Sequence, residues 1–261
     1  MIKEIRILRI RDKKENLTDK VAEELPLTIF VNGEELATLL CSPDDLKYLI
    51  LGFLYNEGII KSVKDVKELR INKDKGISNV KIRNLDKNLK DIFQRRVITS
   101  GCSGFYNPSD LKLKKIKSNF KIKKEKINEL MQELMKTSAV FKETGGVHIS
   151  ALCDDKKIIF FNEDIGRHNT IDKIIGKSLE KNINLKNKII LTSGRLSSEM
   201  VLKAAKQQIP LVASKSAPTE LAIKLAKNLG MTLVGFVRND KVNVYCGERR
   251  VLVNSFNLSG L

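Results

Sequence analysis

The stretch KIILTSGRLSSEMVLKAAKQQIPLVASKS, residues 188–216, decides the fold class of this 261-residue chain. It contains a short apolar strand, a helix with an apolar stripe and a second short apolar strand. Apolar strands separated by helices are typical of a parallel sheet with helices on both faces. The stretch therefore predicts a three-layer α/β domain with a largely parallel centre.

The same pattern continues on both sides of this stretch. A helix is expected over 218–230 and a strand over 231–238, which pairs with a last strand around the turn Asn239-Asp240. Upstream, two strands flank a polar turn near 154–157, and a helix begins just after Gly166. Right-handed crossovers place the strand-to-helix loops at one sheet edge, where ligands of open α/β sheets usually bind.

The N-terminal part is predicted to be a smaller α+β part rich in hairpins. One hairpin is predicted within 25–43 around Asn32-Gly33, a dipeptide that suits a type I′ turn, and a second spans 66–84. Ser42 is expected to cap the next helix, with Asp45 completing a Ser-x-x-Asp capping pattern. The lysine-rich run from Lys112 to Lys126 is expected to be a solvated linker or helix face, which places the domain boundaries at 1–125 and 126–261.

Composition excludes several classes of protein. The formal net charge is +17, but lysine is spread along the chain, which does not favour a specific nucleic-acid partner. No apolar stretch approaches the roughly 18–20 residues of a membrane span, and the N-terminus lacks the apolar core of a signal peptide. A cytoplasmic protein without a membrane partner is expected. Four cysteines without a C-x-x-C pair, and only two histidines, do not favour a zinc site.

Three loops at the predicted sheet edge resemble one another. Gly166-Arg167 and Gly194-Arg195 each stand just before a helix, and Arg238 ends a strand. Glycine allows a ligand to approach the backbone, and arginine binds phosphate in a bidentate manner. These residues predict a pocket for a phosphate-rich ligand such as a dinucleotide, although surface arginines are also common. No Walker A or G-x-G-x-x-G motif points to an ordinary ATPase or dehydrogenase.

His168 follows Arg167 at the same predicted helix start. It is either a general acid/base or ligand-binding group, or it caps its helix or bonds to the acidic pair Glu163-Asp164. The sequence leaves both interpretations open.

Cys102 lies in VITSGCSGFY, residues 97–106, among the smallest side chains. Buried cysteines are ordinarily small apolar packing residues, but a turn of glycine and serine offers little packing. Free N–H groups and basic surroundings favour a thiolate there. The tripeptide Thr-Ser-Gly recurs at 192–194, again after an apolar strand. Cys102 is therefore the candidate reactive thiol.

Six blocks of the chain resemble the FdhD/NarQ family of formate dehydrogenase accessory sulfurtransferases. They stand in the order of that family and cover most of the chain. The blocks are SPDDLKYLILGFLYNEGII, TGGVHISAL, EDIGRHNTIDKIIG, TSGRLSSEMVLKAA, IPLVASKSAPTELAIKLA and TLVGFVRNDKVNVY.

The resemblance implies a sulfurtransferase. Members of the family take sulfur from a cysteine desulfurase as a cysteine persulfide, at a mobile-loop position that Cys102 matches. They pass it to the molybdenum (or tungsten) bis-guanine-dinucleotide cofactor of formate dehydrogenase, for which GDP is a mimic. The resemblance also implies a homodimer and a cytidine-deaminase-like C-terminal domain that binds the cofactor. The matching cofactor-binding segment consists of Phe236, Val237, Arg238, Asn239, Asp240 and Lys241.

Two sequence features qualify this implication. Deaminase chemistry itself is not expected, because the chain lacks the H-x-E and P-C-x-x-C zinc motifs. Many relatives carry a second cysteine three residues after the first, where this chain has Phe105. A two-thiol relay is therefore in doubt, and a cofactor-binding chaperone without sulfur transfer stays an alternative.

Overall fold

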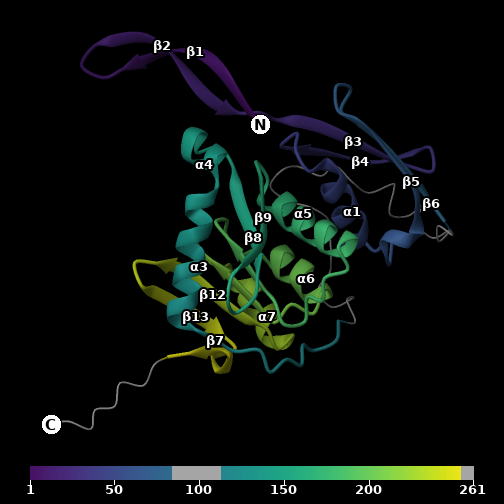
Figure 1. The fold of residues 1–261 in the computed structure, drawn as a ribbon, viewed down its shortest axis with the longest axis vertical. Helices are drawn as coiled ribbons and strands as arrows, with labels where there is room; N and C mark the ends of the chain where they lie inside the picture. Colours follow the sequence, from purple (N-terminus) through teal and green to yellow (C-terminus); the bar gives the residue numbers. More distant parts are fainter. Residues whose placement is uncertain (84–112, 254–261) are drawn as a thin grey trace. The chain divides into compact units, whose positions relative to one another are not determined.

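The structure is a computed structural model that describes residues 1–83 and 113–253. It shows a mixed α/β fold, which confirms the predicted fold class (Figure 1). The chain divides into two compact units, and each combines several stretches of sequence. The first holds the described residues of 1–106, 137–149 and 162–183; the second holds those of 107–136, 150–161 and 184–261. These units differ from the predicted domains 1–125 and 126–261. Residues 137–149 and 162–183 belong to the same unit as the N-terminal part.

A six-stranded sheet contains the predicted parallel centre. Its order is β13-β12-β11-β10-β8-β9. The strands are β8 (His148–Cys153), β9 (Ile158–Asp164), β10 (Ile189–Thr192), β11 (Leu211–Ser214), β12 (Thr232–Arg238) and β13 (Lys241–Cys246). Strand β11 pairs in parallel with β10 and with β12, whereas β8 and β13 pair antiparallel with their neighbours. Every residue of β10 and β11 is buried, as expected for strands covered on both faces.

Two helices connect the parallel strands. Helix α6 (Ser198–Lys206) follows β10, and α7 (Glu220–Asn228) follows β11. The second unit also contains most of α3 (Lys124–Thr137) and the short strands β7 (Ile122–Lys123) and β14 (Val251–Leu252), which pair in parallel. The two parallel crossovers therefore have the predicted strand–helix–strand form.

The described part of the lysine-rich run is not a free linker. Residues 113–121 form no helix or strand, and Ile116 is only 3% exposed. Its N–H donates to the carbonyl oxygen of Leu229 at 2.8 Å, and the Lys114 carbonyl accepts from the side chain of Gln208. This segment, called the strap below, is held on the second unit by the buried Ile116. The many lysines around this residue make such a contact hard to predict from the sequence.

The first unit contains the predicted hairpins. Its four-stranded sheet has the order β4-β3-β6-β5. The strands are β3 (Leu25–Val31), β4 (Glu34–Cys41), β5 (Val66–Asn72) and β6 (Ile77–Ile82). Asn32 and Gly33 have φ angles of 51° and 92°, as a type I′ turn requires, so the first hairpin is confirmed.

Another hairpin of the first unit was not predicted. Strands β1 (Ile2–Ile10) and β2 (Lys14–Ala22) pair along their whole length (Figure 1). Leu8 and Ile10 are 52% and 66% exposed. The alternation of charged and apolar residues there is a strand pattern, but the turn lacks the usual Asn-Gly signature.

The predicted helix cap at Ser42 is wrong. Helix α1 (Leu46–Asn56) begins only at Leu46, and its N-cap Asp45 has a φ of 53° and no side-chain cap bond. The Ser42 hydroxyl instead accepts the N–H of Ile165 at 3.1 Å, and the Ser42 N–H donates to the Asp164 carboxylate. Ser42 therefore bonds to residues more than 120 positions away in the sequence and does not cap the neighbouring helix.

Helix α1 packs closely against α5 (Arg167–Glu180) in the first unit (Figure 1). Two glycines make this possible. A Cβ at Gly52 would lie 1.8 Å from the Asp172 carbonyl oxygen, and one at Gly176 would lie 2.0 Å from the Tyr48 carbonyl oxygen. Because the obstacles are backbone atoms, the helices could not keep this spacing with alanine at either position.

Candidate functional site

Three loops of the second unit meet at the carboxyl ends of β10, β11 and β12. After β10, the Thr192 carbonyl accepts the N–H of Lys215, and the Gly194 carbonyl accepts the Ser214 hydroxyl at 2.6 Å. After β11, the Ser216 carbonyl accepts the N–H of Phe236 at 3.1 Å. The predicted residues Gly194 and Arg195 and the segment 236–241 are thus joined at one sheet edge through the loop of residues 214–219.

The loop 214–219 is the member of this edge that sequence reasoning missed. It repeats the loop 192–197 in structure: a strand, a bend, a bridge between Leu196 and Pro218, and then a helix. The Leu196 N–H donates to the Ala217 carbonyl at 3.0 Å, and the Leu196 carbonyl accepts the N–H of Thr219 at 2.9 Å. The sequences TSGRLS (192–197) and SKSAPT (214–219) agree only in having Ser or Thr at the first position and at the N-cap. This similarity is a weak signal for a shared loop structure. The other Thr-Ser-Gly, at 99–101, lies outside the described residues.

The hairpin at the end of β12 has an unusual backbone. Phe236, Asn239 and Asp240 have φ angles of 52°, 50° and 60°. Asn and Asp adopt this region readily in turns, but an aromatic residue there is strained. Phe236 falls where the register between β12 and β13 shifts, between Gly235 and Arg238. Strained residues of this kind concentrate at binding sites.

This hairpin lines a cavity of about 470 Å³. The lining side chains come from five residues: Phe236, Arg238, Asn239, Lys241 and Asn243. The Arg238 guanidinium lies 5.3 Å from the centre of the Phe236 ring, a cation–π distance that leaves its edge free to donate hydrogen bonds. Two cations and two amides suit an anionic, hydrogen-bonding ligand such as a nucleotide phosphate.

Gly235 keeps the base of this hairpin narrow. A Cβ at this position would lie 3.0 Å from Pro218 and 3.0 Å from Tyr245. The glycine therefore allows the loop 214–219 to approach the hairpin and fixes the position of Phe236.

Gly166, Arg167 and His168 belong to the first unit, at the N-terminus of α5. The neighbouring Asp164 is fully buried and accepts four donors. These are the backbone N–H groups of Ser42 and Gly166, the side-chain amide of Asn169 and the ammonium of Lys173, the last at 2.7 Å. Gly166 is needed for this network, because a Cβ there would lie 2.8 Å from the Asn169 amide nitrogen. The EDIGRHN block therefore has a structural role in the first unit.

His168 is only 6% exposed. Glu163, one of the two acidic residues predicted to bond it, accepts the Ser138 hydroxyl. Whether His168 or Arg167 takes part in ligand binding stays a prediction, as do the binding roles of Gly194, Arg195 and the segment 236–241.

Three of the four cysteines are buried. Cys41 and Cys153 are fully buried, and Cys246 is 8% exposed. Burial raises the pKa of Cys41 to about 12 and also raises the pKa values of Cys153 and Cys246. These thiols are protonated at neutral pH and are poor nucleophiles. Cys102 lies outside the described residues.

Within residues 1–83 and 113–253, no group of three or more His, Cys, Asp or Glu side chains is placed to hold a metal ion. None of the helices in this part of the chain is long and apolar enough to cross a membrane.

Known proteins resemble this chain over most of its length. Residues 22–252 match the model of the FdhD/NarQ family. The sulfur carrier protein FdhD of Bacillus pumilus (strain SAFR-032) is 44% identical and covers 90% of this chain and 91% of its own. That of Staphylococcus aureus (strain MRSA252) is 41% identical over 94% of this chain and 95% of its own. A crystal structure named for a formate dehydrogenase accessory protein of Desulfotalea psychrophila superposes with a TM-score of 0.77 at 26% identity, covering 97% of this chain and 99% of the other.

Proposed function

The chain belongs to the FdhD/NarQ family, and on that premise we propose that it is a sulfur carrier. In this proposal Cys102 accepts sulfur from a cysteine desulfurase. The protein then passes the sulfur to the molybdenum (or tungsten) bis-guanine-dinucleotide cofactor, which is required for formate dehydrogenase activity.

The main support for this proposal is the burial of the other three thiols. A sulfur carrier needs a thiolate that can reach a donor protein. Cys41, Cys153 and Cys246 are buried and their pKa values are raised, so none meets that requirement. Cys102 is the remaining cysteine, and its neighbours Gly101 and Gly104 suit an accessible loop.

The first step is a sulfur exchange without net oxidation. The Cys102 thiolate attacks the outer sulfur of the desulfurase persulfide, a new S–S bond forms, and the desulfurase cysteine leaves as a thiolate. The bound sulfur is then a Cys102 persulfide. Its delivery as sulfide consumes two electrons, because sulfane sulfur is at the oxidation level of the element. An external reductant of the thiol class would supply them, since this chain has Phe105 where many relatives carry a second cysteine.

The hairpin cavity is the part of the structure that suits the cofactor. Arg238 and Lys241 would pair with phosphates of a guanine dinucleotide, for which GDP is the simplest probe. The amides of Asn239 and Asn243 offer donors and acceptors to a base or sugar. Support for this assignment comes from the strained Phe236 and from the match of 236–241 to the binding segment of the family.

A second candidate function is a chaperone that binds the cofactor without transferring sulfur. The absence of a second cysteine at Phe105 favours it. It requires the hairpin cavity but not the Cys102 thiol, so the two functions make opposite predictions for one substitution.

The experiment is complementation of a bacterial strain that lacks its own accessory protein. We expect formate dehydrogenase activity with the wild-type chain and with Cys246→Ala, but a loss of at least about 100-fold with Cys102→Ala. Western blotting confirms that all three accumulate. Full activity of Cys102→Ala would contradict sulfur transfer and favour the chaperone.

We further propose a cytoplasmic homodimer. The proposal rests on the family resemblance and on a carrier thiol that must stay reduced between cycles. Light scattering should then give about twice the chain mass of 29.5 kDa. A monomer mass at micromolar concentration would contradict it.

A further inference from the structure

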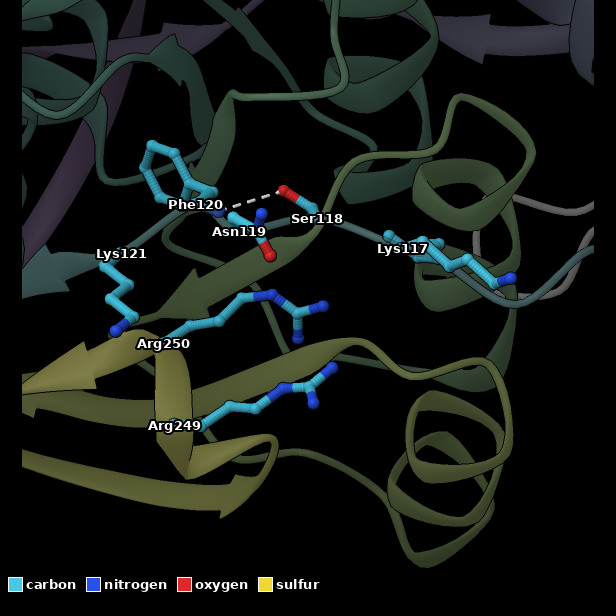
Figure 2. Close-up of a pocket in the computed structure, with 8 residues that line it drawn as sticks. Lys117, Ser118, Asn119, Phe120, Lys121, Arg249 and Arg250 are labelled. Atoms are coloured by element: carbon cyan, nitrogen blue, oxygen red, sulfur yellow. Dashed lines mark hydrogen bonds between the residues drawn. The ribbon is translucent and has the colours of Figure 1, made fainter.

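The second unit has another cavity, of about 420 Å³ (Figure 2), and the described residues that line it differ from those of the hairpin cavity. One wall consists of residues 116–121, the second part of the strap, and the other is the short 3-10 turn of Glu248–Arg250. Pairing of β7 with β14, with Ile122 opposite Val251, joins the two walls. The strap is fixed at its other end by the bond between Ile116 and Leu229. The cavity is thus bounded by anchored backbone on both sides.

Among the described residues that line this cavity, the charge is entirely positive. The charged side chains are Lys117, Lys121, Arg249 and Arg250, and none of the described lining residues is Asp or Glu. Figure 2 shows the guanidinium groups of Arg249 and Arg250 extending in the same direction into this space. In the described part of the chain, neither arginine forms an ion pair with a carboxylate.

Arg250 is the decisive residue because it is 98% buried without a counter-charge, being only 2% exposed. Its Nη1 donates to the Thr232 hydroxyl at 3.1 Å, while Nε and Nη2 have no hydrogen-bond partner among residues 1–83 and 113–253. A buried cation with unused donors is unfavourable in the empty protein. Burial, and secondarily the charge of Arg249, lower the pKa of Arg250. A bound anion would supply a counter-charge to the guanidinium and accept hydrogen bonds from Nε and Nη2.

The chain holds Arg250 in this position by specific contacts. Thr232 accepts from Arg250 and donates to the Gly247 carbonyl at 2.7 Å. Gly247 has a φ of 69°, and a Cβ there would lie 2.5 Å from the Met231 carbonyl oxygen. The turn is therefore built around a glycine that places the arginine side chain at the cavity.

We propose that this cavity is a second binding site, for a phosphoryl group of a small molecule. A tetrahedral dianion can accept two donors from each guanidinium at once, which matches the paired arginines. A cavity of about 420 Å³ has room for inorganic phosphate, pyrophosphate or the phosphate end of a sugar phosphate. A nucleic-acid backbone would need a longer groove. No described residue is shared between this site and the hairpin cavity, so the proposal does not rest on the sulfur-carrier function.

Titration calorimetry of the full chain at constant ionic strength tests the proposal. The probes are inorganic phosphate, pyrophosphate, ribose 5-phosphate and a 20-mer duplex DNA, with chloride as the reference anion. We expect saturable binding of one or more of the three phosphates. Arg249→Ala should weaken it at least about tenfold, because one charge-assisted pair of bonds is lost. Lys115→Ala, which removes an exposed charge of the same strap outside the cavity, should change the affinity less than about twofold.

A second variant separates a binding role from a structural one. Arg250→Met removes the buried charge and keeps the volume, so it should raise the melting temperature without phosphate and abolish the phosphate-dependent rise. Absence of phosphate binding to the wild-type chain would overturn the proposal. So would binding of DNA alone, or phosphate binding that Arg249→Ala and Arg250→Met leave unchanged.

Discussion

At the scale of single residues, burial identifies Cys41, Cys153 and Cys246 as packing residues. The Cys41 Sγ donates to the Leu25 carbonyl oxygen and that of Cys246 to the Met231 carbonyl oxygen, both at 3.5 Å. Such thiols act as small packing groups. The sequence already distinguished Cys102 by its glycine and serine neighbours, since burial favours larger apolar ones. It could not show how deeply the other three are buried, because that depends on strands brought together from distant positions.

Thiol labelling should reflect this division. We expect a neutral aromatic disulfide reagent to modify one thiol per chain in the native wild type, none in native Cys102→Ala, and four in the wild type unfolded in urea. The physical reason is that only a thiolate accessible to the reagent reacts quickly. Rapid labelling of two or more thiols in the native protein would contradict the burial of Cys41, Cys153 and Cys246.

The raised pKa of Cys41 predicts a loss of stability in alkali. The folded state keeps the proton up to about pH 12, whereas the unfolded state releases it near the ordinary value of 9.0. The stabilising contribution is therefore complete below pH 9 and declines as the pH rises toward 12. Between pH 7 and 10, wild type should lose about 1 kcal/mol more free energy of unfolding than Cys41→Ala, measured by urea denaturation. Equal losses in the two proteins would contradict the raised pKa.

At the scale of elements, local signals succeeded where no tertiary contact competed with them. Asn32-Gly33 specifies its turn alone, because both positions need a positive φ. Ser42 fails as a cap because Ile165 and Asp164 use its hydroxyl and N–H. The close pair of α1 and α5 was not predicted either, since nothing in the sequence shows that Gly52 and Gly176 face a neighbouring backbone.

The helix pair makes a stability prediction. Gly176→Ala should lower the free energy of unfolding by about 2–3 kcal/mol, because the new methyl group overlaps the backbone of α1. Lys47→Ala, an exposed position on α1 that removes only a surface ion pair with Glu180, serves as the control. It should cost less than about 1 kcal/mol by urea denaturation. A similar cost for both would show that the helices are farther apart than described.

The β12–β13 hairpin makes a binding prediction. Arg238→Ala and Lys241→Ala should each weaken GDP binding about tenfold, because each loses a charge-assisted contact to phosphate. Lys224→Ala, an exposed lysine of α7 that does not line the cavity, is the control and should bind like wild type. Fluorescence of a labelled GDP analogue provides the measurement. Unchanged affinity of both hairpin variants would place the nucleotide elsewhere.

At the scale of the whole molecule, the α/β class was predictable because short apolar strands alternate with helices along one continuous part of the chain. The compact units were less predictable, since stretches such as 137–149 and 162–183 return to the N-terminal unit. The net charge of +17 indicates a binding site only where the fold brings several positively charged side chains together. Arg250 shows this best: a sequence cannot reveal that one arginine among 48 basic residues is buried with no carboxylate paired to it in the described part of the chain.

Mass spectrometry of the protein after incubation with a cysteine desulfurase and cysteine tests the central claim most directly. We predict a mass increase of one sulfur atom, about 32 Da, on the peptide that contains Cys102. The increase should be reversed by a reducing thiol and absent from Cys102→Ala. An unmodified Cys102 peptide, or the added sulfur on Cys41, Cys153 or Cys246, would contradict the account.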